Sequence, residues 1–165
     1  AAKRRMAAGL HFERRGHGAA PCQSWSFVSE VDELLAQTSP VVQRRGAYRR
    51  EDNAQLIQSV DCAIMPSIWW ENAPLVIQEA QGQNRPVICS NIGGMAEMIT
   101  DGINGLTVLP NDPLALAQAM RRMAENPDLR QSLGENARHP DTIDTTAARY
   151  LDLIGSLRAA RVEAA

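Results

Sequence analysis

Residues 67–97 read SIWWENAPLVIQEAQGQNRPVICSNIGGMAE, and this stretch decides the fold. It predicts a loop and then a helix that begins near Pro74 and ends near Gly82, because proline suits the first helical turn and glycine suits the end of a helix. The apolar residues 86–89 predict a buried strand, and Gly93 and Gly94 open a further helix. Strands and helices in this order predict the ligand-binding edge of a parallel sheet.

The segments on either side continue the alternation. Upstream, residues 53–60 predict a helix and residues 61–66 a buried strand that Pro66 stops. Downstream we expect a short helix over residues 95–99, a strand over residues 106–109, a helix that Asp112 caps, and helices over residues 127–137 and 142–161. Near the start, residues 25–28 predict a strand and residues 30–37 a short helix. The pattern predicts an α/β protein with a doubly wound, Rossmann-like parallel sheet.

The length of 165 residues fits one domain with a substantial core. The clear alternation lies in residues 41–165, so we expect residues 1–40 to be a divergent or truncated first part. Residues 1–50 carry nine Lys or Arg and four Asp or Glu, a net of +5, whereas residues 51–165 carry eight and fifteen, a net of −7. We interpret the basic part as a solvated surface and expect no nucleic-acid partner.

The cysteines are odd in number and include no CxxC pair: Cys22, Cys62 and Cys89. Cys62 and Cys89 lie in apolar runs, where a free thiol behaves as a small hydrophobe, so we expect a reducing, cytoplasmic compartment. The longest apolar runs are too short for a transmembrane helix. The three histidines have no ligand-like spacing, and we expect no metal site.

Two carboxylates flank the predicted helix start, Glu71 in the loop and Glu79 eight residues later. Between them, the amides from about Asn72 to Val76 and the helix dipole suit an anion such as phosphate. Glu79 can accept hydrogen bonds from vicinal ribose hydroxyls. Each feature alone is more often a surface acid or a simple turn, but the ordered set predicts a site for a ligand with a sugar, a phosphate and a nucleoside.

Residues 48–137 resemble the carboxyl-terminal half of the retaining glycosyltransferases of family 4, also called group 1 glycosyl transferases. The resemblance is carried by motifs in the same order: Gly46-x-Tyr48, Asp61, Pro66-Ser67, Glu71-Asn72-Ala73-Pro74-Leu75, Glu79-Ala80, Arg85-Pro86-Val87-Ile88, Gly93-Gly94-x-x-Glu97 and Asp101-Gly-x-Asn-Gly105. It implies one half of a two-Rossmann-domain (GT-B type) glycosyltransferase. Residues 41–165 would then be the nucleotide-sugar-binding domain with its C-terminal helices.

The resemblance also implies roles for single residues. Glu71 takes the catalytic position that contacts the hydroxyls of the donor sugar, and Glu79 takes the position that holds the ribose. We expect the donor sugar and diphosphate at Asn72, Ala73, Leu75, Val76, Gly93 and Gly94. Pro74 has no N–H and cannot donate. Transfer would move a hexose with retention of the anomeric configuration and would need no metal or other cofactor.

Two departures from the family bear on activity. Members carry an Arg and a Lys, in a Gly-Arg then Lys-Gly context, that neutralise the diphosphate; the nearest match, Arg14-Arg15-Gly16, lacks the following Lys-Gly. The amino-terminal acceptor-binding domain is missing from these residues, so we expect a fragment that binds the nucleotide sugar but is inactive alone. The alternatives are a non-catalytic nucleotide-sugar-binding or regulatory module, and a structural remnant.

Two further predictions concern the surroundings of the site. Trp69 and Trp70 are expected to pack under the loop, with stacking on a sugar or base as the alternative. We expect four arginines to form a solvated surface, with contact to the donor phosphates as the alternative: Arg44, Arg45, Arg49 and Arg50. A further expectation is that the full enzyme contacts the inner face of the membrane peripherally.

Overall fold

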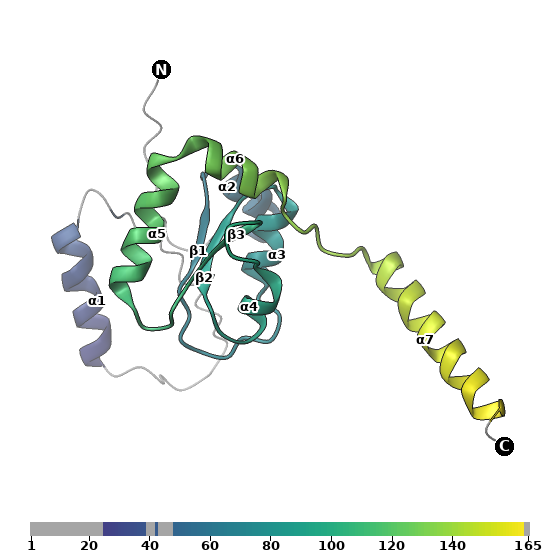
Figure 1. Ribbon diagram of the computed structural model, residues 1–165. Coiled ribbons are helices and arrows are strands. Elements are labelled where there is room, and N and C mark those ends of the chain that lie inside the picture. Colours follow the sequence, from purple (N-terminus) through teal and green to yellow (C-terminus); the bar gives the residue numbers. More distant parts are fainter. Residues whose placement is uncertain (1–24, 39–41, 43–47, 164–165) are drawn as a thin grey trace.

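The structure is a computed structural model that describes residues 25–38, 42 and 48–163. In this part of the chain the centre is a three-stranded parallel sheet (Figure 1). β1 (Ala63–Met65), β2 (Val87–Ser90) and β3 (Gly105–Val108) lie in the order β1-β2-β3. Ala63 pairs with Val87, and Val87 pairs with Gly105. Because all three strands run the same way, their carboxyl ends meet at one edge of the sheet.

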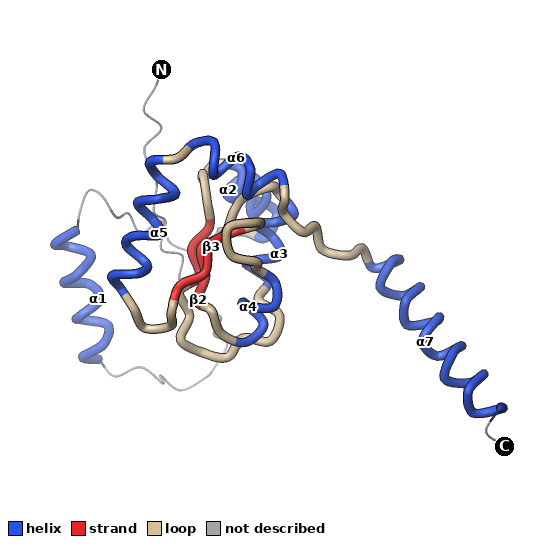
Figure 2. Tube along the Cα trace, in the orientation of Figure 1, coloured by secondary structure: helices blue, strands red, loops and turns tan. Residues whose placement is uncertain are grey.

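The described part of the chain also contains helices, several of which connect the strands and cover the sheet (Figure 2). They are α1 (Trp25–Thr38), the 3-10 helix η1 (Arg50–Asp52), α2 (Asn53–Gln58), α3 (Leu75–Gly82), α4 (Gly93–Met98), α5 (Pro113–Glu125), α6 (Pro127–Glu135) and α7 (Ile143–Glu163). The predicted strand–helix alternation from residue 53 onward is therefore confirmed. Asp112 caps α5 as expected, since its carboxylate accepts a hydrogen bond of 2.9 Å from the Ala115 amide.

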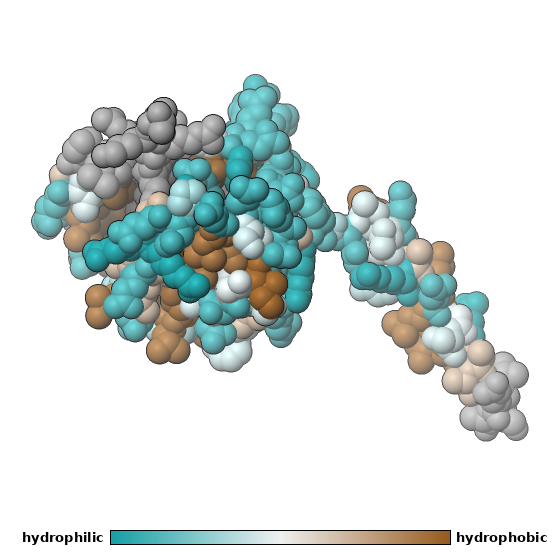
Figure 3. Space-filling view, turned by 45° about the horizontal axis from the view of Figure 1, so that its top comes forward, coloured by the Kyte–Doolittle hydropathy of each residue, from teal (hydrophilic) through white to brown (hydrophobic). Residues whose placement is uncertain are grey.

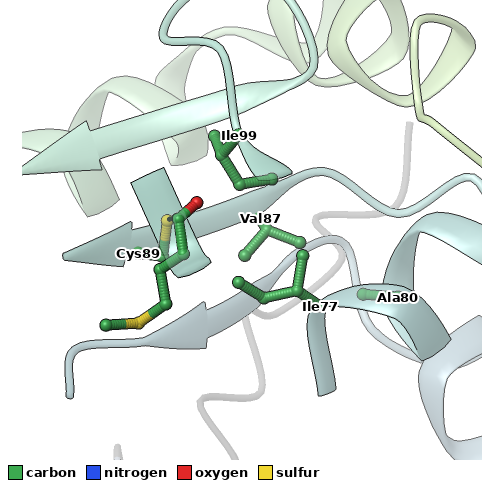
Figure 4. Close-up of a cluster of buried hydrophobic side chains, with 6 residues drawn as sticks. Ile77, Ala80, Val87, Cys89 and Ile99 are labelled. Atoms are coloured by element: carbon green, nitrogen blue, oxygen red, sulfur yellow. Dashed lines mark hydrogen bonds between the residues drawn. The ribbon is translucent and has the colours of Figure 1, made fainter. Parts of the chain in front are cut away.

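Each face of the sheet has its own buried cluster. Val87 and Cys89 of β2 face α3 and α4, where they pack with Ile77, Ala80, Met95 and Ile99 (Figure 4). Ile88 points to the opposite face and packs with Leu106, Val108, Met123 and Leu133. Successive strand residues point to opposite faces, so β2 contributes to both clusters. Each fully buried aliphatic side chain stabilises the fold by about 1.5–3 kcal/mol, and the two clusters confirm a doubly wound arrangement.

Two predictions need correction. The strand predicted at residues 25–28 is wrong, because these residues form the first turn of α1. The strand predicted as buried at residues 61–66 is only half-buried, because β1 has one neighbour, β2, in the described sheet. The predicted last helix is confirmed, and its side chains are exposed along all of residues 143–161. α7 projects from the body in Figure 1 and shows apolar surface in Figure 3.

Candidate functional site

The loops that follow β1 and β2 meet at the carboxyl edge of the sheet. The loop after β1 carries Glu71 into α3, and the loop after β2 leads into α4. A hydrogen bond of 2.7 Å from the Gly94 amide to the Glu71 carbonyl oxygen joins the two. Only glycine fits there, since a Cβ on residue 94 would lie 1.8 Å from the Asn72 carbonyl oxygen. The start of α4 therefore fixes the backbone of the loop that carries Glu71.

Backbone amides form a row of unused donors before and at the start of α3. Pro74 caps this helix, with φ −64° and ψ 117°. Its carbonyl oxygen accepts hydrogen bonds from the amides of Ile77 at 3.2 Å and Gln78 at 3.4 Å. The two residues on either side of Pro74 are exposed, and within the described part of the chain no acceptor faces their amides: Asn72, Ala73, Leu75 and Val76. These donors lie at the positive end of the helix dipole and suit an anion.

Glu71 and Glu79 bracket this row of amides, and both residues are half-buried. Glu79 follows Leu75 by four residues and Val76 by three, so it lies on the same side of α3 as these exposed residues. The Glu71 amide donates to the Trp69 carbonyl oxygen at 2.9 Å, which turns the loop sharply before the helix. Neither carboxylate forms an ion pair with any described residue, so both can accept hydrogen bonds from a ligand.

The two glycines at the start of α4 have different roles. Gly93 has φ +54°, a conformation that favours glycine, and within the described chain its amide has no acceptor. The Gly94 amide is already used by Glu71. The structure thus leaves the Gly93 amide for the predicted ligand contact, whereas Gly94 holds the loop.

The motif at residues 101–105 is a structural turn between α4 and β3. The buried Asn104 side chain donates to the Met98 carbonyl oxygen at 3.1 Å and accepts from the Thr100 amide at 2.7 Å. The Asp101 carboxylate accepts from the Thr107 amide at 2.8 Å. These bonds fix the turn that leads into β3.

The surroundings of the site differ in part from expectation. The prediction that Trp69 and Trp70 pack under the loop is wrong, because both are 73% exposed. Arg49 and Arg50 are exposed, as expected for a solvated surface, and the Arg49 Nε lies 3.3 Å from Glu51. Four other arginines fall outside the described residues: Arg14, Arg15, Arg44 and Arg45. The prediction for residues 1–40 as a divergent first part stays a prediction.

A cleft lies at the opposite edge of the sheet, before β1 and β2. It measures about 500 Å³ and is lined by Asp61, Arg85 and Arg130 among others. Arg85 donates to the Gln58 carbonyl oxygen at 2.6 Å, and Arg130 donates to that of Ala124 at 2.9 Å. Both guanidinium groups therefore donate to backbone carbonyl oxygens, although the buried Arg85 Nε has no partner among the described residues.

The described cysteines are unsuited to nucleophilic chemistry. Burial, with a smaller effect of Asp101, raises the pKa of the Cys89 thiol to about 12. Burial and Asp61 raise the pKa of Cys62 to about 11, against a smaller opposing effect of Arg130. Among the described residues, no group of three or more His, Cys, Asp or Glu could hold a metal ion. No helix in the same ranges is long and apolar enough to cross a membrane.

Comparisons with known proteins agree on one family. The family model described as "Glycosyl transferases group 1" matches residues 32–140, more than half of the chain. D-inositol 3-phosphate glycosyltransferase of Streptomyces coelicolor is 34% identical over 116 residues, which are 68% of this chain and 25% of that protein. The chain spans about a quarter of the length of such curated relatives.

Two solved structures are similar to this chain in fold. HepE from Anabaena, in complex with UDP, is 26% identical with a TM-score of 0.60, over 69% of this chain and 32% of that one. The C-terminal domain of the group 1 protein LpcC from Francisella tularensis has a TM-score of 0.62 over 76% of this chain and 63% of that one. The latter is 20% identical, and the likeness concerns the fold alone.

Proposed function

Because this chain belongs to the group 1 glycosyl transferases, we propose that it is the part of such an enzyme that binds the nucleotide-sugar donor. Its fold is the Rossmann-like α/β fold of one half of a GT-B type glycosyltransferase. The observation that carries the proposal is the row of unused amides at the start of α3, bracketed by Glu71 and Glu79.

Each part of a nucleotide sugar has a matching group in this row. Diphosphate oxygens accept hydrogen bonds from the exposed amides, and the dipole of α3 favours their negative charge. The Glu79 carboxylate accepts hydrogen bonds from the ribose hydroxyls. The Glu71 carboxylate accepts hydrogen bonds from hydroxyls of the transferred sugar. The UDP bound to HepE makes UDP a suitable first probe.

The proposal extends to the reaction. Backbone amides supply the charge compensation for the diphosphate, so donor binding needs no metal, and chelation with EDTA should leave the UDP affinity unchanged. The donor sugar is a hexose transferred with retention of configuration, which NMR of a product made by the longer enzyme would test. The free thiols Cys62 and Cys89 support a cytoplasmic location.

Calorimetry with UDP tests the ribose contact. We expect Glu79→Ala to weaken UDP binding by about 10- to 100-fold, because hydrogen bonds to a charged group contribute about 1.5–3 kcal/mol. Glu125→Ala is the matched control, since Glu125 is exposed on α5, away from this edge. Equal affinities of the native chain and Glu79→Ala would reject the ribose role.

A second titration separates the two carboxylates. Glu71→Ala should weaken UDP-glucose binding relative to UDP, because only the sugar nucleotide carries the hydroxyls that Glu71 contacts. If Glu71→Ala lowers the affinity for both ligands equally, the assignment of Glu71 to the sugar is wrong.

We also propose that the chain alone does not catalyse transfer. A donor site without a facing acceptor-binding surface cannot position the nucleophile or exclude water. A radiolabelled-donor assay on the isolated chain should show no turnover above background, and robust transfer would overturn this part. Binding of UDP without transfer in a longer enzyme would instead favour a regulatory module.

A further inference from the structure

Three consecutive apolar residues lie exposed immediately before Glu71. Ile68 is 68% exposed, and Trp69 and Trp70 are each 73% exposed. Single exposed apolar residues are common on protein surfaces. Two neighbouring exposed tryptophans on the loop that carries the proposed ligand-binding carboxylate are less common, and contiguous exposed apolar surface often marks a binding site.

Hydrogen bonds hold the backbone of the loop that carries the two indoles. The Ser67 hydroxyl accepts a hydrogen bond of 3.1 Å from the Trp69 amide, and the Trp69 carbonyl oxygen accepts one of 2.9 Å from the Glu71 amide. The Trp70 ring rests against the backbone of Gly93, since a Cβ on Gly93 would lie 3.3 Å from the Trp70 Cε3 atom. The ring is therefore supported on one side while most of its surface remains open.

A sugar ring matches this arrangement in its chemistry. A pyranose has hydroxyls around its edge and C–H groups on its faces, so it needs hydrogen-bond acceptors beside it and an apolar surface beneath it. Glu71 supplies the acceptor, and an indole supplies a large rigid surface at low conformational cost. Ligand sites commonly combine aromatic surface with a few placed polar groups in this way.

We propose that Trp69 and Trp70 form an aromatic platform on which a pyranose ring stacks beside Glu71. The platform rests on the proposed donor site and deepens it, because it adds a surface that selects the sugar. The pyranose is either the sugar of the donor or a sugar unit of the acceptor, and both share the stacking face.

The intrinsic fluorescence of the chain provides the first test. The chain has three tryptophans, so Trp25→Phe leaves only Trp69 and Trp70 as reporters. We expect a nucleotide sugar or a methyl glycoside to quench and blue-shift the emission beyond the effect of the parent nucleotide. The panel is UDP, UDP-glucose, UDP-N-acetylglucosamine, GDP, GDP-mannose and the methyl glycosides of the same sugars. A response to nucleotide sugars alone identifies the donor sugar, and a response to methyl glycosides identifies an acceptor unit.

Calorimetry on single variants provides the second test. Trp70→Ala should weaken binding of the responding sugar ligand by about 5-fold or more, on the scale of aromatic stacking in other ligand sites, while UDP affinity stays unchanged. Trp70→Phe should recover part of the loss, because it keeps a ring. Ile68→Ala is the matched control, with similar exposure but no ring, and should bind as the native chain does.

The outcomes separate this inference from the donor-binding proposal. The platform is overturned if the native chain binds UDP, no sugar in the panel changes the fluorescence further, and Trp70→Ala loses no affinity for the sugar ligands. That result leaves the proposed donor site intact. Full quenching by UDP alone overturns the platform in favour of base stacking. If UDP does not bind, the donor-binding proposal fails. Binding of the methyl glycosides to the native chain and to Trp70→Ala then tests the platform independently.

Discussion

Replacing Gly94 with alanine tests whether the contact between α4 and the loop holds the proposed donor site together. The new Cβ would lie 1.8 Å from the Asn72 carbonyl oxygen, whereas real Cβ contacts essentially never fall below 3.0 Å. The loop must therefore withdraw by at least 1.2 Å, the difference between the two distances. This movement stretches the 2.7 Å hydrogen bond between the Gly94 amide and Glu71.

The expected effects follow from the size of that movement. Overpacking costs about 1–3 kcal/mol and the weakened hydrogen bond about 0.5–1.5 kcal/mol. We expect Gly94→Ala to lower the free energy of unfolding by about 2–4 kcal/mol, which leaves a domain of ordinary stability folded. Because the amide row moves with the loop, its hydrogen bonds to the diphosphate weaken, and UDP affinity should fall by about 10- to 100-fold, since hydrogen bonds to charged groups contribute about 1.5–3 kcal/mol.

Urea unfolding and UDP calorimetry measure the two effects, with two glycine controls. Gly155→Ala introduces the same methyl group into open space on α7 and should change neither quantity by much. Gly102 also has open space but a φ of +72°, so Gly102→Ala should lose about 1–2 kcal/mol of stability through strain while UDP affinity stays the same. The reasoning is refuted if Gly94→Ala binds UDP as tightly as the native chain and unfolds at the same urea concentration.

Three other changes test the body of the fold. Asp112→Ala removes the cap of α5 and should cost about 1 kcal/mol in urea unfolding; an unchanged midpoint would contradict the cap. Gln81 is 2% exposed and its Nε2 has no partner among the described residues, so Gln81→Met should raise the free energy of unfolding by about 1 kcal/mol. The pKa of Cys89 is raised from 9.0 to about 12, so above pH 9 the unfolded thiol ionises while the folded one stays protonated. The stability that Cys89 contributes should therefore be complete below pH 9 and fall as the pH rises toward 12; a Cys89→Ala variant with the same slope would reject this origin.

The central part of the fold could be predicted because each element has a local signal. β2 is a short apolar run after Pro86, and its four residues are all buried. α5 begins at Pro113 after a capping aspartate, so composition and capping agree on one boundary. Where local signals are short the prediction failed. Residues 25–28 are too few to distinguish a strand from one helical turn, and the structure makes them part of α1.

For the candidate site, prediction from the sequence has a different limit. Glu71 and Glu79 were visible in the sequence as carboxylates at a helix start, because that signal is local. The contact of Gly94 with the Asn72 carbonyl oxygen joins segments from two strands and has no local signal. The exposure of Trp69 and Trp70 was missed because large aromatic residues are usually buried. Tertiary contacts decide both features.

The exposed helix α7 has a consequence for how the chain melts. A helix of 21 residues whose described side chains are all exposed is held almost entirely by its own hydrogen bonds. Such a helix loses residues gradually from its ends as temperature rises, unlike a packed domain. The far-ultraviolet circular dichroism should therefore drift below the cooperative transition of the α/β body. Loss of that drift in a larger assembly would report that α7 has found a surface to pack against.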